Sequence, residues 1–358
     1  MYEKALWTRR RWLQAAGAAA VCGSLAGCGQ SRQEVNTSAA RVLKVFNWAD
    51  YIQEEVIPQF EADYRCAVVY DNYASDSELE TRLATGGGAY DVVFPSDRTM
   101  HALLAKGVLT KIDKSRLPNL RNLDPKFLSP PFDLYNDFSI PYFWGTLAVG
   151  IRTDFITHSV SGFEVLFDPR HRGRITMLDD LESVVAAVLA HLGLPLNSTA
   201  PAHLVQVQRL LQEQKPLVQA YTSDSYRERL ITGEAWAVLG WSGDLAQAAR
   251  EEPRVKLIVP RSGTMTWLDS MAIPRAAKNV DLAHSFINYL LDAGPALKNA
   301  LAVRYATPNL AARERLPEAM RQDESVYPPP ETLSRCAWLQ DRGADIEKIE
   351  AIWRVVRS

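Results

Sequence analysis

The stretch that decides the fold is residues 42–70, VLKVFNWADYIQEEVIPQFEADYRCAVVY, where two short apolar runs flank a segment with helical spacing. Residues 42–46 and 66–70 predict strands, because both are short and rich in β-branched and aromatic side chains. The apolar side chains of residues 52–64 recur every three to four positions, which predicts a helix with one buried face. Together they predict a strand, a helix and a second strand in succession.

The same alternation continues beyond this stretch. Ser75 and Glu78 have the spacing of a capping box and predict the start of a second helix. Residues 91–96 predict a third strand, after which Ser96 or Asp97 is expected to cap a third helix. Alternating strands and helices favour an α/β fold with a parallel sheet, in which ligands bind beyond the carboxyl ends of the strands.

The rest of the chain reads as the same fold class. About 320 residues follow residue 40, which is more than one hydrophobic core usually holds, so two lobes are expected. Residues 140–145 are predicted to interrupt the first lobe, and residues 146–151 to form a strand that leads into new alternating units. Further helices are predicted near residues 163–166, 184–192, 202–212, 225–231, 280–291, 295–302 and 346–356.

Residues 1–28 have the form of an export signal, with three consecutive arginines followed by an apolar run too short to span a bilayer. Residues 8–13, TRRRWL, resemble the twin-arginine export motif. Residues 25–28, LAGC, resemble a bacterial lipobox, in which the signal is cleaved before a lipidated Cys28. An export signal without lipidation is the alternative. Residues 29–40 are polar and predict a flexible tether.

The charge and the cysteine content limit the class of partner. Removing residues 1–28 takes away four Lys or Arg and one Glu, so the formal net charge changes from −2 to −5. A mildly acidic chain disfavours nucleic acid as a partner and suits a cationic ligand. Cys66 and Cys336 are the only cysteines beyond Cys28. We expect buried thiols there, and pairing of the two after export is the alternative.

Two expected strand ends each carry a tryptophan followed by a carboxylate. Trp241 and Asp244 lie in the segment LGWSGD, where a strand should meet a helix that begins at Ser242 or Asp244. In the segment TWLDSM, strand alternation puts Trp267 and Asp269 on the same face. An aromatic face stabilises an alkylammonium group by about 0.5 to 2 kcal/mol, and a carboxylate accepts its N–H donors. The pattern predicts a site for an organic cation; the alternative is that Trp267 belongs to the core and Asp269 caps a turn.

Three further regions offer side chains of the same kinds. Trp48 and Asp50 follow the first strand, Tyr305 lies in an expected loop, and residues 179–182 form an acidic corner where a helix begins. Carboxylates at helix starts are commonly caps, so a structural role for this corner is the alternative. None of the six histidines forms a His-x-x-x-His pair, so no metal site is expected.

Several of these segments resemble bacterial spermidine/putrescine-binding proteins of polyamine ABC transporters, from about residue 43 to residue 353. The most specific pieces are FNWADY (residues 46–51), AYDVV with PS (89–96), KIDKSRLPNLRNLDP (111–125), SIPY with WG (139–145), WLDS (267–270) and ATPNLAA (306–312).

The resemblance implies a two-lobed periplasmic-binding-protein fold of type II and a transport protein rather than an enzyme. Putrescine or spermidine would be held in a cleft between the lobes and delivered to an ABC transporter permease. Lobe 1 would comprise residues 41–146 and 268–314, and lobe 2 residues 147–267 and 315–358. The protein is expected to be a monomer in the periplasmic space and to bind no cofactor. It would contact the membrane only through the lipid anchor. The implied ligand-binding residues are Trp48, Asp50, Tyr51, Ser96, Asp180, Trp241, Asp244, Trp267, Asp269 and Tyr305.

The chain departs from the family pattern at three positions. Ala49 replaces a serine or threonine, which removes a hydroxyl group from the implied site. Ser183 stands where some members carry a glutamate, and the neighbouring Glu182 is expected on the wrong face of the helix. Arg98 stands where an aromatic or small polar residue is usual. A cation near the site of a dication costs Coulomb energy unless it is turned outward or paired, and we expect Arg98 to be an exposed helix residue.

Two other functions are left open by the sequence. The same fold could bind another nitrogenous solute, such as agmatine or an amino-acid-like zwitterion whose carboxylate meets Arg98. A glycosidase would need two carboxylates as acid and base. Its candidates would be Asp180, Glu182, Asp244 and Asp269. The segment GWSGD does not fit the nucleophile elbow of α/β hydrolases, because aspartate replaces the final glycine.

Overall fold

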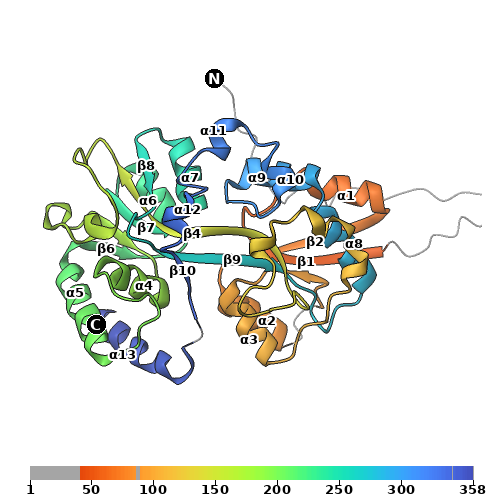
Figure 1. The fold of residues 1–358 in the computed structure, drawn as a ribbon, viewed down its shortest axis with the longest axis horizontal. Coiled ribbons are helices and arrows are strands. Elements are labelled where there is room, and N and C mark those ends of the chain that lie inside the picture. The colour runs from red at the N-terminus through yellow and green to blue at the C-terminus, as the bar shows by residue number, and fades with distance from the viewer. Residues whose placement is uncertain (1–40, 86–88, 341, 358) are drawn as a thin grey trace, which may run out of the picture. The chain divides into compact units, whose positions relative to one another are not determined.

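The computed structural model describes residues 41–85, 89–340 and 342–357 of the chain (Figure 1). The expectations for the export signal, the lipidated Cys28 and the tether fall on residues 1–40 and lie outside the described residues.

A three-stranded parallel sheet comes first in the chain, in the order β2-β1-β3. Its strands are β1 (Arg41–Trp48), β2 (Cys66–Tyr73) and β3 (Val92–Val93). The helices that follow them are α1 (Val56–Tyr64), α2 (Asp76–Ala84) and α3 (Asp97–Ala105). The predicted alternation is confirmed, and so are two of its caps. Ser75 accepts a hydrogen bond from the Glu78 amide, and Ser96 accepts one from the Thr99 amide.

Two of the expected bounds differ. The first helix begins at Val56 rather than near Ile52, because the chain first turns through Asp50, whose φ of 53° is left-handed. The third strand is much shorter than residues 91–96. Pro95 lacks an amide hydrogen with which to continue the ladder.

A seven-stranded mixed sheet follows, in the order β10-β9-β4-β7-β5-β6, with β8 paired to β4 (Figure 1). Its strands are β4 (Ile140–Arg152), β5 (Ile175–Met177), β6 (Val218–Tyr221), β7 (Ala237–Trp241), β8 (Val255–Ile258), β9 (Met265–Met271) and β10 (Ala337–Trp338).

Strand β4 is one continuous buried strand from Ile140, whereas the sequence predicted a strand only over residues 146–151, after a segment that interrupts the first lobe. Its first half pairs antiparallel with β9, and its second half pairs with β7 and β8. The end of β9 continues to Ala272, which forms an antiparallel bridge with Val93 of β3. The long pair β4 and β9 therefore connects the two sheets, as Figure 1 shows.

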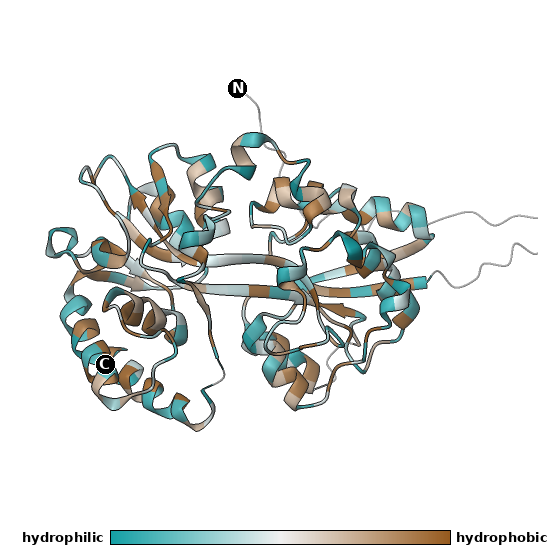
Figure 2. Cartoon of the chain, in the orientation of Figure 1, coloured by the Kyte–Doolittle hydropathy of each residue, from teal (hydrophilic) through white to brown (hydrophobic). Residues whose placement is uncertain are grey.

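The remaining helices lie where the helical spacing predicted them, except for three short helices between residues 310 and 333 that were not predicted. They are α4 (Leu181–His191), α5 (Pro201–Gln214), α6 (Tyr226–Thr232), α7 (Ser242–Glu251), α8 (Val280–Leu290), α9 (Ala293–Val303), α10 (Leu310–Arg313), α11 (Glu318–Arg321), α12 (Pro330–Leu333) and α13 (Ile346–Arg357). Helix α4 is apolar on all sides over residues 184–189 and is buried against α5 and α13 (Figure 2). Helix α7 begins at Ser242, one of the two predicted starting residues, and Trp241 occupies its N-cap position without a side-chain hydrogen bond.

The described cysteines, Cys66 and Cys336, are free and half-buried. Burial raises the pKa of both thiols. Within the described part of the chain, no helix has the length and apolar character needed to cross a membrane.

Candidate functional site

Four aromatic side chains from different segments form a contiguous cluster. Trp241 lies at the end of β7, Trp267 in β9, Tyr305 just after α9 and Tyr51 after β1. The Trp241 and Trp267 rings meet edge to face at 6.1 Å between centroids, and Trp267 meets Tyr305 at 5.1 Å. Tyr305 in turn meets Tyr51 at 5.4 Å. These edge-to-face contacts fix the orientation of each ring.

Tyrosine hydroxyls hold two carboxylates in this cluster. The Tyr51 hydroxyl donates to Asp269 Oδ2 at 2.6 Å, and the Tyr305 hydroxyl donates to Asp244 Oδ1 at 2.6 Å. The Tyr226 hydroxyl also donates to Asp244, at Oδ2. The cluster therefore contains two acids whose hydrogen-bond partners are neutral.

Neither of these acids has a cationic partner in the described residues, where no Lys or Arg forms an ion pair with Asp244 or Asp269. Asp269 is 8% exposed, and burial raises its pKa well above the ordinary value. Burial likewise raises the pKa of Asp244, although the hydrogen bonds from Tyr226 and Tyr305 oppose the shift. A cation that donates hydrogen bonds to these oxygens would favour their charged forms.

Two glycines allow the rings to come this close to the backbone. A Cβ atom on Gly243 would lie 2.2 Å from Cδ1 of Tyr305. A Cβ atom on Gly145 would lie 2.5 Å from Cζ2 of Trp267. Both distances are far below van der Waals contact, so a larger residue at either position would displace the ring.

Trp48 is the last residue of β1, and Asp50 lies in the turn that leads from it to Tyr51. The Trp48 indole donates from Nε1 to the Phe94 carbonyl at 3.0 Å, and its ring lies 4.4 Å from that of Tyr73. Asp50 is exposed in the turn that follows, and its negative charge contributes, after burial, to the raised pKa of Asp244. The structure thus brings Tyr51 together with the two predicted pairs, Trp241 with Asp244 and Trp267 with Asp269.

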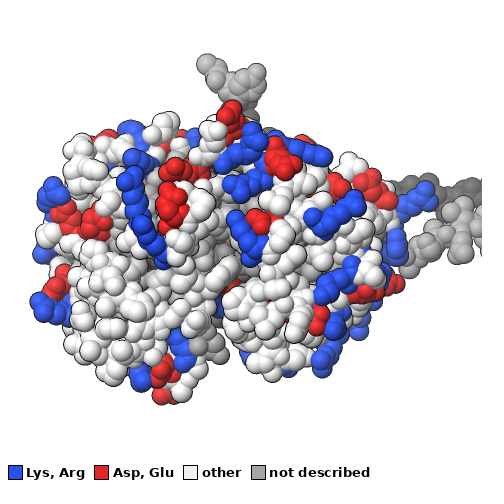
Figure 3. Space-filling model, in the orientation of Figure 1, with Lys and Arg blue, Asp and Glu red and all other residues white. Residues whose placement is uncertain are grey.

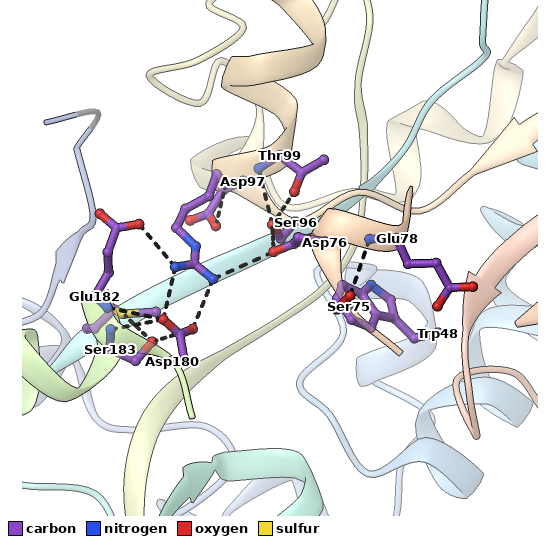
Figure 4. Close-up of polar contacts among 12 residues, drawn as sticks. Trp48, Ser75, Asp76, Glu78, Ser96, Asp97, Thr99, Asp180, Glu182 and Ser183 are labelled. Atoms are coloured by element: carbon purple, nitrogen blue, oxygen red, sulfur yellow. Dashed lines mark hydrogen bonds and ion pairs between the residues drawn. The ribbon is translucent and has the colours of Figure 1, made fainter. Parts of the chain in front are cut away.

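The two remaining predicted residues, Ser96 and Asp180, belong to an adjoining network of acids (Figure 4). The Ser96 hydroxyl donates to Asp76 Oδ2 at 2.9 Å. Asp180 is the N-cap of α4 and accepts hydrogen bonds from the amides of Glu182 and Ser183. The predicted capping role of the acidic corner is therefore present in Asp180.

Arg98 joins the parts of this network, and the expectation that it would be an exposed helix residue is wrong. Its Nη1 donates to Asp180 Oδ1 at 3.1 Å and its Nη2 to Asp180 Oδ2 at 2.9 Å, which is a bidentate pair. Nη1 also donates to Glu182 Oε2 at 3.1 Å, and Nη2 lies 3.6 Å from Asp76 Oδ2. Asp76, Asp180 and Glu182 each contact the guanidinium of Arg98, and Figure 4 draws these contacts as dashed lines.

The expectation for Glu182 also needs correction, because it is not turned away from the network. It lies 3.1 Å from Arg98 and 3.3 Å from Nε of Arg342. Ser183 takes part as well, since its hydroxyl donates to Asp180 Oδ2 at 3.0 Å. Burial favours the protonated form of Asp180, but Arg98 and these hydrogen bonds outweigh it and hold its pKa below the ordinary value.

Sequence reasoning missed two residues of these networks. Tyr226 is 1% exposed in α6 and reaches Asp244 from 18 positions away, and no local pattern marks it. Asp76 lies between the capping-box residues Ser75 and Glu78, and its Oδ1 is buried and accepts no hydrogen bond among the described residues. Burial raises the pKa of Asp76, against the opposing charge of Arg98.

A group able to bind a metal lies elsewhere. His158, Asp168 and His171 place one ligand atom each within 4.8 Å of one another. Arg170 already holds the carboxylate, with Nη2 2.5 Å from Asp168 Oδ2, and its hydrogen bonds lower the pKa of Asp168 to about 2. A metal would have to displace this arginine, so the group fits a structural ion pair better.

A groove of about 420 Å³ is lined by Gln53, Arg250, Lys298, Leu301 and Ala302. It presents two cations and no carboxylate, so its charge does not suit an organic cation.

Comparisons with known proteins cover all of these segments. The family model of bacterial extracellular solute-binding proteins matches residues 55–326. The spermidine/putrescine-binding periplasmic protein of Escherichia coli K12 is 34% identical over 354 residues, which are 98% of this chain and 99% of that protein. The putrescine/cadaverine-binding protein of Pseudomonas aeruginosa PAO1 is 34% identical over 85% of this chain and 90% of its own. The structure of the spermidine/putrescine ABC transporter substrate-binding protein PotD from Streptococcus pneumoniae superposes with a TM-score of 0.82 at 30% identity, covering 89% of this chain and 99% of that one.

Proposed function

Because the chain belongs to the bacterial extracellular solute-binding proteins, we propose that it captures a polyamine outside the cytoplasm and delivers it to the permease of an ABC transporter. Its fold is the α/β, two-lobed periplasmic-binding-protein fold of the PotD type. The similarity to proteins named for spermidine, putrescine and cadaverine supports an aliphatic polyamine as the ligand class.

The observation that carries the proposal is the pair Asp244 and Asp269. Asp269 is buried and Asp244 half-buried, neither forms an ion pair with a Lys or Arg in the described residues, and both are held by tyrosine hydroxyls inside an aromatic cluster. Leaving a buried carboxylate without a cation is costly, which the raised pKa of each expresses. An alkyl diamine supplies the missing positive charge, and its methylene groups suit the faces of Trp241 and Trp267.

We assign the ligand to a cleft between two lobes, residues 41–146 with 268–314 and residues 147–267 with 315–358. Strands β4 and β9 would form the crossing segments between them. Contacts to the ligand would come from Trp48, Asp50, Tyr51, Trp241, Asp244, Trp267, Asp269 and Tyr305. Ser96 and Asp180 would act through the neighbouring acid network.

The zwitterion alternative loses support from the surroundings of Arg98. Both terminal nitrogens of this guanidinium are already engaged by Asp180 and Glu182. The carboxylate of an amino-acid-like ligand would have to displace an intramolecular carboxylate of equal charge, which offers no electrostatic gain.

A thermal-shift panel on the mature chain, residues 29–358, tests the ligand class. Putrescine, cadaverine, spermidine and agmatine would be compared with amino acids and glycosides. A ligand that binds only the folded state stabilises it by RT ln(1 + [L]/Kd), so the polyamines are expected to raise the Tm in a concentration-dependent way. Shifts with amino acids or glycosides alone, and none with polyamines, would contradict the proposal.

The place of the protein in the cell follows from the same family. An extracytoplasmic location fits the family, and we propose that the mature chain is a monomer held at the membrane by a lipid on Cys28 after export by the twin-arginine route. The export route and the lipid anchor rest on the sequence of residues 1–28, RRRW and LAGC included.

A further inference from the structure

The acid network around Arg98 contains a positive charge that belongs to the protein itself. Arg98 lies in the first turn of α3, and the acids Asp180 and Glu182 lie at the start of α4. The Asp180 side chain is 14% exposed, so its ion pair with Arg98 is largely shielded from water. A guanidinium in bidentate contact with a shielded carboxylate is geometrically fixed.

Asp180 has no remaining capacity for another donor. A carboxylate offers about four lone-pair sites. The oxygens of Asp180 already accept from Nη1 and Nη2 of Arg98, from the amides of Glu182 and Ser183, and from the Ser183 hydroxyl. An ammonium group could bind Asp180 only by displacing Arg98.

The acids of the aromatic cluster, unlike Asp180, accept hydrogen bonds only from neutral donors. Asp269 accepts a hydrogen bond from Tyr51, and Asp244 accepts two from tyrosines, all of them neutral donors. Glu182, by contrast, shares Arg98 with Asp180 and lies 3.3 Å from a second guanidinium, that of Arg342. The acids at the start of α4 are therefore paired with arginines, whereas those of the cluster form no ion pair in the described residues.

We propose that Arg98 is a tethered cation that fills the Asp180 end of the site and thereby selects short diamines over triamines. The inference rests on the proposed function and narrows its substrate class. Putrescine or cadaverine can place its charges near Asp244 and Asp269. Spermidine carries a third ammonium group, which would meet the guanidinium or have to displace it, and like charges in a shielded site repel strongly.

Calorimetric titration of putrescine, cadaverine and spermidine into wild type and Arg98→Ser tests the selection. Wild type is expected to bind the diamines about tenfold more tightly than spermidine, or better. In Arg98→Ser the ratio of spermidine to putrescine affinity should rise by about tenfold or more, because Asp180 then lacks a cation. Arg254→Ser is the matched control, since Arg254 pairs with Glu252 on the surface, and it should leave the ratio unchanged.

The outcomes separate this inference from the proposed function. If wild type binds polyamines and Arg98→Ser changes the ratio by less than about threefold, the tethered-cation role is wrong while the function stands. A wild type that prefers spermidine would also overturn it. If no polyamine binds either protein, the proposed function fails and this inference with it.

A second measurement needs no polyamine. In Arg98→Ala the vacated space beside Asp180 should accept a small free guanidinium, so millimolar ethylguanidinium is expected to raise the Tm of this variant relative to wild type and to Arg254→Ala. Equal shifts in all three proteins would show that Arg98 does not fill a cation site.

Discussion

Asp269 differs from a surface acid in its burial, its lack of an ion pair and its fixed orientation. It is buried, has no cationic partner in the described residues and is oriented by Tyr51. Asp269→Asn keeps the shape and can still accept the tyrosine hydrogen bond, but it removes the charge. Breaking a desolvated ion pair costs about 3 to 5 kcal/mol, so calorimetry should show a loss of polyamine affinity of about a hundredfold or more.

A capping aspartate provides the control. Asp292 is exposed and caps α9 by accepting a hydrogen bond from the Gly294 amide. Asp292→Asn should cost about 1 kcal/mol of stability or less and leave affinity unchanged. If Asp269→Asn binds polyamine within about threefold of wild type, Asp269 is structural and the ion pair belongs to Asp244 instead.

Asp97 gives a prediction that does not depend on the ligand. Burial raises its pKa to about 7 from an ordinary value of 3.8, despite the opposing charge of Arg98. Between these values the unfolded chain binds fewer protons than the folded chain, so the free energy of unfolding falls as pH rises from about 4 to about 7. The loss from this group amounts to about 4 kcal/mol.

Asp97→Asn removes this loss, because asparagine is neutral at every pH. Urea unfolding should find the variant more stable than wild type at about pH 8, with a difference that shrinks toward pH 4. A stability difference that is the same at both pH values would contradict the assignment.

Single residues also show where sequence reasoning stops. The placement of Trp267 and Asp269 on one face of β9 could be predicted, because alternation along a strand is local. The partners of Arg98 could not, since Asp180 lies 82 positions away and only the folded chain brings α3 and α4 together. Glu182 was assigned to the wrong side of its helix for the same reason.

At the start of α7, Gly243 allows the Tyr305 ring to lie against the backbone. Gly243→Ala should push the ring away and break its hydrogen bond to Asp244, which leaves this half-buried acid with one hydrogen bond fewer. We expect a loss of polyamine affinity of about tenfold or more by calorimetry. Gly294→Ala in α9 is the control, because its nearest atom would be 3.4 Å away. Equal effects of the two substitutions would argue against the close approach of Tyr305 as the cause.

Helices and buried strands were predicted best, because the spacing of their apolar residues can be recognised within short segments. The helices from α4 to α9 and α13 begin and end within a few residues of the expected positions. The continuity of β4 was missed. Its 13 residues stay extended because they pair first with β9 and then with β7 and β8, which are distant in sequence.

For the chain as a whole, the charge distribution agrees with a small cationic ligand. The 40 Lys and Arg nearly balance the 42 Asp and Glu. On the face shown in Figure 3, positive and negative side chains both occur and lie close together in several places. Of the acids proposed to contact the ligand, Asp269 is buried, Asp244 is half-buried and Asp50 is exposed.

The attachment of the chain to a membrane is predicted to depend on the sulfur of Cys28, which would carry the lipid. If Cys28 is lipidated after export, Cys28→Ser should move the protein from the membrane fraction to the soluble extracytoplasmic fraction without changing polyamine affinity. Fractionation followed by immunoblotting checks this. A Cys28→Ser protein that stays with the membrane would point to a different anchor.

A crystal structure of residues 29–358 grown with putrescine would place the ligand. We expect an ammonium group within about 3 Å of Asp269 and the methylene chain against Trp267, with Arg98 still paired to Asp180. Putrescine bound in the groove beside Gln53 and Lys298, or an aromatic cluster without ligand at saturating putrescine, would contradict the assignment of the binding site.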